Sequence, residues 1–210
     1  MINYLALGDS LTVGVGAPSP QYGFVPRYIS MTNKELKKYV FCENIGVSGA
    51  TSDDVLDMVS NSEEIQVLIM QSELISITVG GNDMKNAALQ FLRSKNQSVL
   101  AAALKRFNCN FDNIIDTIHR IKRYDRKNYI LRGMNLYNPF PNTAGTEAWV
   151  RRFNQHIQSF EGKNIRIANI YPIFVGREKE LLSSDKFHPN GKGYYLMAQS
   201  LNELGYYPLY

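Results

Sequence analysis

The chain has 210 residues, of which 44% are hydrophobic and 20% charged, a size and composition typical of one soluble globular domain spanning residues 1–210. Its formal charge is +4 with a pI near 9.0, but basic and acidic residues are interleaved, so we expect no nucleic-acid partner. The densest basic segment, 120–127, falls where a helix is predicted to end, an ordinary place for cations, so we expect a solvated helix end there. No apolar run approaches the roughly 20 residues of a membrane span, which argues against stable membrane insertion.

The N-terminus and the cysteines bear on localisation. Met1-Ile2-Asn3 lacks a basic region followed by a longer apolar core, so no signal peptide is visible. Cys42 and Cys109 are far apart and lack metal-ligand spacing, as expected for buried or reduced thiols. We therefore expect a cytoplasmic protein, with a secreted or surface location as the alternative if a leader was removed.

The first half of the chain alternates short apolar runs with helical periodicity. Short runs rich in β-branched residues predict strands over 2–7, 39–45 and 74–79. Apolar residues three or four positions apart predict helices over 24–38, from Thr51 or Ser52 through Val59, and over 63–71. The glycines and prolines of segment 12–23 indicate a loop that borders a site.

The second half continues the same alternation of helices and strands. Its periodicity predicts, in order, a short helix over 87–92, a long helix over 97–123, a strand over 129–131 followed by a loop over 133–142, a helix over 146–160, a strand over 165–170 and a last helix over 193–204. Five strand–helix repeats predict an α/β fold with a five-stranded parallel sheet and helices on both faces.

Ser10 is the candidate nucleophile. It follows the first predicted strand, which Gly8 interrupts, and so lies at the carboxyl edge of the sheet, where open α/β sheets bind ligands. Taken alone, Gly8-Asp9-Ser10 is equally compatible with a plain turn or a helix N-cap. The residues at the later strand–helix junctions decide between a catalytic serine and a purely structural turn.

Histidine is the side chain best suited to accept the proton of a serine nucleophile near neutral pH. His119 and His156 fall within amphipathic helices, where a structural role is the simpler account. His188 lies in a loop, and Asp185 precedes it by three residues. We therefore predict Ser10 as nucleophile, His188 as base and Asp185 as the group that orients His188.

The remaining junctions supply donors for an oxyanion. The predicted donors are the backbone N–H groups of Ser10 and Gly49 and the side-chain amide of Asn82. The structural alternatives are a turn with positive φ at Gly49 and helix capping at Asn82.

Four motifs carry a family resemblance: Gly8-Asp9-Ser10-Leu11, the block 44–51 that contains Gly49, Gly80-Gly81-Asn82-Asp83, and Asp185-Lys186-Phe187-His188. In order and spacing they resemble the four blocks of the SGNH, or GDSL, hydrolase superfamily, most closely its small bacterial lipase and acylhydrolase group. The resemblance implies a flavodoxin-like three-layer sandwich, ester hydrolysis through an acyl-serine, and no metal or organic cofactor. It assigns the same roles to Ser10, Gly49, Asn82, Asp185 and His188.

Several functional alternatives use the same residues or the same fold. An acyl or acetyl transferase and a carbohydrate acetylesterase need no change of site, so the substrate remains open among lipid esters, acetylated sugars and thioesters. A non-catalytic domain that binds a small ligand is disfavoured, because no glycine-rich phosphate loop is present. The chain also lacks the Gly-x-Ser-x-Gly elbow of α/β-hydrolases. Tyr137 and Phe140 are predicted to wall an acyl pocket for a small ester substrate.

Overall fold

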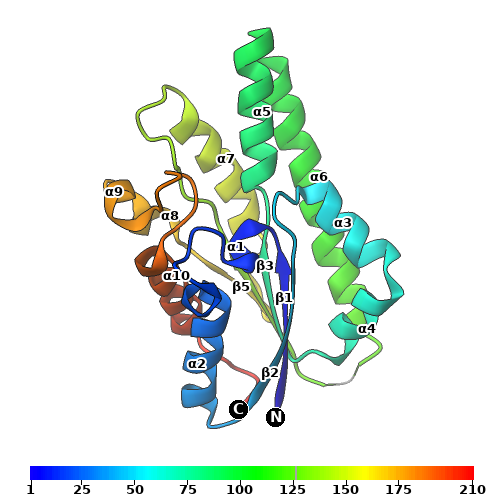
Figure 1. Cartoon of the computed structure of the whole chain (residues 1–210). Helices are drawn as coiled ribbons and strands as arrows, with labels where there is room; N and C mark the ends of the chain where they lie inside the picture. Colours follow the sequence, from blue (N-terminus) through cyan, green and yellow to red (C-terminus); the bar gives the residue numbers. More distant parts are fainter. Residues whose placement is uncertain (126) are drawn as a thin grey trace.

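A five-stranded, fully parallel sheet forms the centre of the computed structural model, which describes residues 1–125 and 127–210 (Figure 1). The strands are β1 Ile2–Gly8, β2 Val40–Gly46, β3 Leu74–Thr78, β4 Ile130–Met134 and β5 Ile165–Ala168. Their order is β2-β1-β3-β4-β5. This is the flavodoxin-like order, so the predicted α/β fold with a parallel sheet is confirmed.

The strand order reverses between β1 and β3. Gly8, the last residue of β1, pairs with Gly46 of β2 on one side and with Thr78 of β3 on the other. The carboxyl ends of these three strands therefore lie side by side. Such a switch point is where open α/β sheets bind their ligands.

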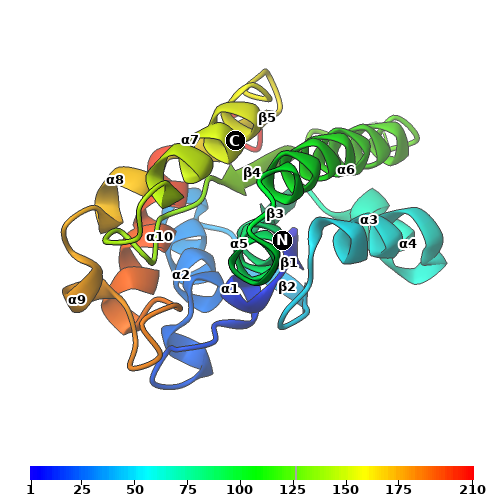
Figure 2. The same cartoon turned by 90° about the horizontal axis from the view of Figure 1, so that it is seen from above.

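Helices connect the strands and cover both faces of the sheet. They are α1 Ser10–Val13, α2 Phe24–Leu36, α3 Ser52–Asn61, α4 Glu63–Gln71, α5 Gly81–Ser94, α6 Ser98–Lys122, α7 Thr146–Gln158, α8 Tyr171–Phe174, α9 Glu178–Leu181 and α10 Gly191–Glu203, with a 3-10 turn η1 at Pro20–Tyr22. Helices α2 and α10 pack on one face, whereas α3, α4, α6 and α7 pack on the other (Figure 2).

The two faces bury separate apolar clusters. Tyr28 of α2 and Met197 of α10 belong to the first cluster, and Ile118 of α6 and Phe153 of α7 to the second. All five residues of β3 are buried, because helices cover it on both sides. Alternate residues of each central strand therefore stabilise opposite layers of the sandwich.

Helix α5 is longer than predicted. The sequence pattern indicated a helix only over 87–92, but α5 begins at Gly81 and ends at Ser94. Few of its side chains are buried, because α5 projects with α6 beyond the sheet (Figure 1). The apolar periodicity of a helix buried along its whole length is therefore missing from its sequence.

The structure differs from the sequence-based expectations at three further places. Gly133 belongs to β4 and not to the loop that follows it. The short helices α8 and α9 were not predicted, because a single turn leaves no periodic pattern. Lys122, assigned to a solvated helix end, has a buried side chain whose Nζ donates to the carbonyl oxygens of Met70 and Ser72 at 2.7 and 2.9 Å. Arg126 of the same basic segment lies outside the described residues.

Two observations concern the expected absence of a membrane span and the state of the cysteines. Over residues 1–125 and 127–210, the structure contains no helix that is both long and apolar enough to span a membrane. Cys42 and Cys109 are free thiols, and Cys109 is exposed and not buried.

Candidate active site

Ser10 is positioned by a sharp turn at the end of β1. Gly8 has φ of 139°, and a Cβ atom there would lie 2.3 Å from the Thr78 carbonyl oxygen, so only glycine fits. Asp9 then caps α1, its Oδ1 accepting the Leu11 N–H at 3.0 Å. Ser10 is the first residue of α1 and is only 4% exposed.

A buried polar cluster supports this turn. The Thr78 hydroxyl donates to Asp9 Oδ1 at 2.8 Å and lies 2.8 Å from the hydroxyl of Thr12, which donates to the Leu7 carbonyl oxygen. Burial raises the pKa of Asp9, and the hydrogen bonds that its carboxylate accepts from Leu11 and Thr78 oppose the shift. Sequence reasoning missed Thr78 and Thr12, because a threonine in a strand or turn carries no motif of its own.

The structure brings the three predicted triad residues into contact. His188 Nε2 lies 2.9 Å from Ser10 Oγ, and His188 Nδ1 lies 2.6 Å from Asp185 Oδ2. An ionised Asp185 places the imidazole proton on Nδ1, so Nε2 is free to accept the Ser10 hydroxyl proton. The arrangement can therefore withdraw a proton from Ser10.

Asp185 also organises the loop that carries His188. Its Oδ1 accepts the backbone N–H groups of Phe187 and His188 at 2.8 and 2.9 Å, and the hydroxyl of Ser183 at 2.8 Å. Partial burial alone would raise the pKa of Asp185, but the hydrogen bonds from His188, the backbone and Ser183 hold it well below its usual range. The carboxylate thus remains ionised and able to orient the imidazole.

Segment 12–23, predicted as a loop that borders a site, begins with the last two residues of α1 and includes η1, and it packs against the His188 loop. A Cβ atom on Gly16 would lie 2.8 Å from His188 Cβ, so the two chains approach closely. The hydroxyl of Tyr194 in α10 donates to the Val15 carbonyl oxygen at 2.6 Å. On the other side, the Tyr137 hydroxyl donates to the Phe187 carbonyl oxygen at 2.7 Å. The His188 loop is therefore held from both sides.

The predicted oxyanion donors Asn82 and Gly49 come from neighbouring segments at the same edge. Asn82 is buried in the first turn of α5, and its Nδ2 donates to the Ala50 carbonyl oxygen at 2.9 Å. An amide nitrogen carries two hydrogens, so a second remains for an oxyanion. Gly49 has φ of 87°, as a turn requires, and is exposed in the loop after β2; it does not line the cavity beside Ser10.

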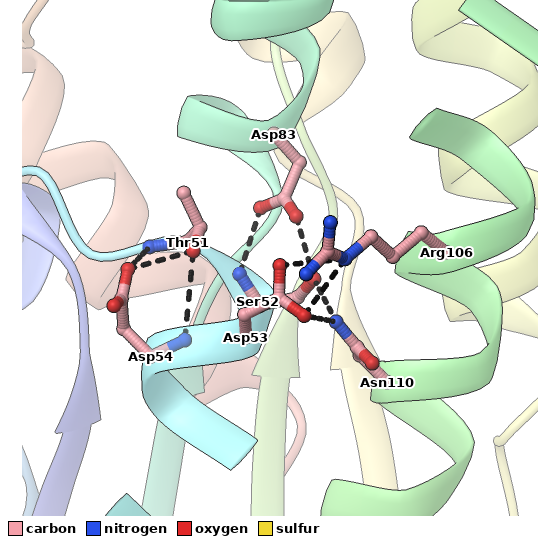
Figure 3. Close-up of polar contacts among 7 residues, drawn as sticks. All are labelled: Thr51, Ser52, Asp53, Asp54, Asp83, Arg106 and Asn110. Atoms are coloured by element: carbon pink, nitrogen blue, oxygen red, sulfur yellow. Dashed lines mark hydrogen bonds and ion pairs between the residues drawn. The ribbon is translucent and has the colours of Figure 1, made fainter. Parts of the chain in front are cut away.

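A second polar cluster links this loop to α5 (Figure 3). Asp83 accepts the N–H of Ser52 at 2.9 Å and its hydroxyl at 2.5 Å. Asn110 of α6 donates to Ser52 Oγ and to Asp53, which also pairs with Arg106 at 2.8 Å. Burial raises the pKa of Asp83 despite its hydrogen bonds from Ser52. Adjacent residues, Asn82 and Asp83, thus fasten α5 to the segment that follows Gly49.

The other two histidines lie away from this site. His119 lies on α6, and His156, on α7, pairs with Asp112 at 2.9 Å. Within the described part of the chain, no group of three or more His, Cys, Asp or Glu side chains is arranged to hold a metal ion. Among the residues that the structure describes, His188 is the histidine that contacts a serine hydroxyl at the switch point.

Two cavities adjoin the site. A small one of about 30 Å³ lies beside Ser10 and is lined in part by Asn82 and Tyr137. A larger one of about 1070 Å³ lies between α5, α6 and α7, and Phe140 forms part of its wall. The structure therefore places the two predicted acyl-pocket residues in different cavities.

A serine, a histidine and a carboxylate joined by hydrogen bonds at the carboxyl edge of a parallel sheet define the class of serine hydrolases. A family model supports this class and narrows it: that of the GDSL-like lipase/acylhydrolase family matches residues 6–196. The chain therefore belongs to this family, and it is a serine esterase.

Individual relatives agree with this assignment. The spore germination lipase LipC of Bacillus licheniformis is 35% identical over 98% of this chain and 97% of its own length. The crystal structure of the lipase Lip_vut3 from a goat rumen metagenome has 34% identity and a TM-score of 0.95, with both chains fully covered. The acetylxylan esterase Axe2 of Geobacillus stearothermophilus, with 17% identity, a TM-score of 0.69 and coverage of 98% and 94%, shares the fold.

Proposed function

We propose that this chain hydrolyses carboxylic esters with Ser10 as nucleophile, His188 as general base and Asp185 as the residue that orients His188. The observation that carries the proposal is the continuous hydrogen-bonded path from Asp185 Oδ2 through both ring nitrogens of His188 to Ser10 Oγ. We also propose that residues 1–210 act as one hydrolase domain, because both apolar clusters pack on the same sheet.

In the first step, His188 Nε2 accepts the Ser10 proton while Ser10 Oγ attacks the ester carbonyl carbon. The resulting imidazolium is stabilised by the ionised Asp185 and then protonates the departing alcohol. In the second step, His188 Nε2 accepts a proton from the water that attacks the acyl-serine, and it returns that proton to Ser10 Oγ as the carboxylic acid leaves. Every proton moves between Ser10, water, the leaving alcohol and one imidazole nitrogen, so the residues present suffice for the reaction.

The negative charge that develops on the carbonyl oxygen needs donors already in place. We assign the backbone N–H of Ser10, the backbone N–H of Gly49 and Asn82 Nδ2 to this role. Support comes from the burial of Asn82 and from its hydrogen bond to Ala50, which holds its amide against the segment that contains Gly49. Such preorganised donors stabilise the transition state more than the substrate.

A fluorophosphonate probe tests the nucleophile directly. We expect one covalent adduct per chain, located on Ser10 by peptide mass spectrometry, together with hydrolysis of p-nitrophenyl acetate. Ser30, exposed on α2, provides a matched control: Ser30→Ala should label like the unchanged protein, whereas Ser10→Ala should not label. An adduct on another serine, or neither labelling nor hydrolysis, would overturn the proposal.

A further inference from the structure

The large cavity between α5, α6 and α7 is a groove with an apolar wall. Its volume is about 1070 Å³, at the upper end of the roughly 300–1,000 Å³ of small-molecule sites. We call it the α5–α7 groove; its wall includes Leu89, Phe91, Leu100, Phe140, Trp149 and Phe153. Figure 1 shows α5 and α6 rising together beyond the sheet, and both Figures 1 and 2 show α7 on the same side of the molecule as these helices.

The groove adjoins the cavity beside Ser10. Met84 and Phe187 line both spaces, so the two cavities are direct neighbours. Along α5 the wall runs from Met84 to Leu92, nine residues that span about 12 Å at the ~1.5 Å rise per residue of a helix. An acetyl group attached to Ser10 would leave nearly all of this length empty.

The chemistry of the wall favours hydrocarbon. Leu92 is 56% exposed and Phe140 46% exposed, although both belong to the wall, and contiguous exposed apolar surface of this kind marks a binding groove. Asn138, one of its polar residues, already donates to the hydroxyl of Thr146, at 3.1 Å. A sugar would need many free hydrogen-bonding groups, whereas a hydrocarbon chain gains free energy by leaving water.

The charged groups of the wall do not alter this conclusion. Its ionisable side chains among the described residues are Lys85 and Arg152, and each lies over an aromatic ring. Lys85 Nζ is 5.3 Å from the Phe187 ring centroid and Arg152 Cζ is 4.9 Å from that of Trp149. These cations carry no carboxylate neighbour in the wall, so the groove does not repel the acid that ester hydrolysis releases.

We propose that the α5–α7 groove binds the acyl chain of a long-chain ester, which makes lipid esters the substrate class in place of acetylated sugars. The inference rests on the proposed function of Ser10, because the groove matters to catalysis only if the acyl carbonyl is attacked there. It assigns to Phe140, Trp149 and the facing residues of α5 and α6 the choice of chain length.

A series of p-nitrophenyl esters from acetate to decanoate tests the groove. We expect kcat/KM to rise by roughly fourfold per added methylene until the groove is filled, the equivalent of ~0.8 kcal/mol for each buried methylene. A second arm compares ethyl decanoate with decyl acetate and separates an acyl-chain site from an alcohol-chain site. Highest activity on acetate, or preference for decyl acetate, would overturn the proposal.

Two alanines on α6 provide a matched pair of variants. Ala101 lines the groove and Ala102 does not, and both are exposed, so either site accommodates a large side chain without repacking the core. Ala101→Trp should lower the decanoate-to-acetate ratio of kcat/KM by at least tenfold, since it displaces two or more methylenes. Ala102→Trp should leave the ratio unchanged. Equal ratios in the two variants would contradict the assignment.

Binding of the product acid separates this inference from the catalytic one. Isothermal titration of dodecanoate into Ser10→Ala needs no chemistry at Ser10. We expect saturable 1:1 binding that Ala101→Trp weakens and Ala102→Trp does not. No binding would reject the groove even if esters are hydrolysed, whereas binding without any ester hydrolysis would keep the groove and reject the role of Ser10.

Discussion

The site around Ser10 and the α5–α7 groove lie at the same end of the sheet, yet different forces hold them. Around Ser10, polar contacts join residues far apart in the chain, 69 positions for Asp9 and Thr78 and 178 for Ser10 and His188. In the groove, α5 and α6 are consecutive helices and the wall is largely apolar. The first region depends on directional bonds, the second on buried area.

This difference predicts how each region responds to substitution. A directional contact is lost when one atom is removed, and a buried donor or acceptor without a partner is expensive. Apolar contacts are individually weak and change gradually with the area buried. Substitutions around Ser10 should therefore lower activity on every ester, whereas substitutions in the groove should change only the preference for chain length.

Ser10→Ala should show the largest effect. Removal of the hydroxyl leaves His188 without a nucleophile to activate, so ester hydrolysis should be abolished for acetate and decanoate alike. The variant should keep the circular dichroism spectrum of the unchanged protein, because alanine fits wherever serine does. Wild-type turnover in the folded variant would falsify the assignment of the nucleophile.

Asp185→Asn should lower kcat by roughly 10³, less than the ~10⁴ of the best-studied triad. The amide cannot stabilise the imidazolium as a carboxylate does, but backbone N–H groups still donate to the remaining oxygen and hold the loop. Turnover of p-nitrophenyl acetate by the purified variant measures the effect. Full kcat in this variant would show that Asp185 only stabilises the turn of the loop that carries His188.

The same variant has a predicted pH signature in stability. The pKa of Asp185 is lower in the folded protein than in the unfolded chain, so its contribution to stability is fully present above the ordinary aspartate pKa. As the pH falls below roughly 4, that contribution is lost. The difference in Tm between the unchanged protein and Asp185→Asn should therefore be constant near neutral pH and shrink in acid; a difference that grows in acid would contradict the assigned shift.

Asn82→Ala should lower kcat by about 10² to 10³ with a smaller change in KM, as expected for loss of one oxyanion donor. Asn44 offers a control, since its Nδ2 also donates to a backbone oxygen at this edge, that of Thr12, at 2.9 Å. Asn44→Ala should lower kcat by less than tenfold. A change confined to KM in Asn82→Ala would indicate ordinary substrate binding instead.

Asp83→Asn should have the smallest effect, about a tenfold fall in kcat on all chain lengths, the size of one weakened hydrogen bond. In Asp83 both carboxylate oxygens accept hydrogen bonds from Ser52. In the asparagine variant one of these oxygens becomes an NH2 group, which faces a Ser52 donor and cannot accept from it. The link between α5 and the Gly49 segment is therefore loosened. Asp53→Asn is the control, because it breaks the ion pair with Arg106 in the same cluster but leaves this link intact. Equal effects of the two variants on kcat would mean that the cluster only stabilises the fold.

Part of the site could be predicted from the sequence, because local geometry restricts which residue types fit at these positions. Gly8 marks the end of β1, since any side chain there meets the backbone of β3. Asp185 and His188 share one loop, so their contact is local. The contacts of Thr78 with Asp9, of Gly16 with His188 and of Asp83 with Ser52 were not predicted, because each joins residues that only folding brings near.

Short-range periodicity and turn chemistry depend on neighbouring residues, so the alternation of strands and helices and the positions of the catalytic candidates could be predicted from the sequence. The length of α5 and the presence of the α5–α7 groove depend on how distant segments pack and could not be predicted. A helix that projects from the sheet lacks a fully buried apolar stripe, so its sequence carries a weak signal. A groove is a property of surfaces that meet, and no single segment contains it.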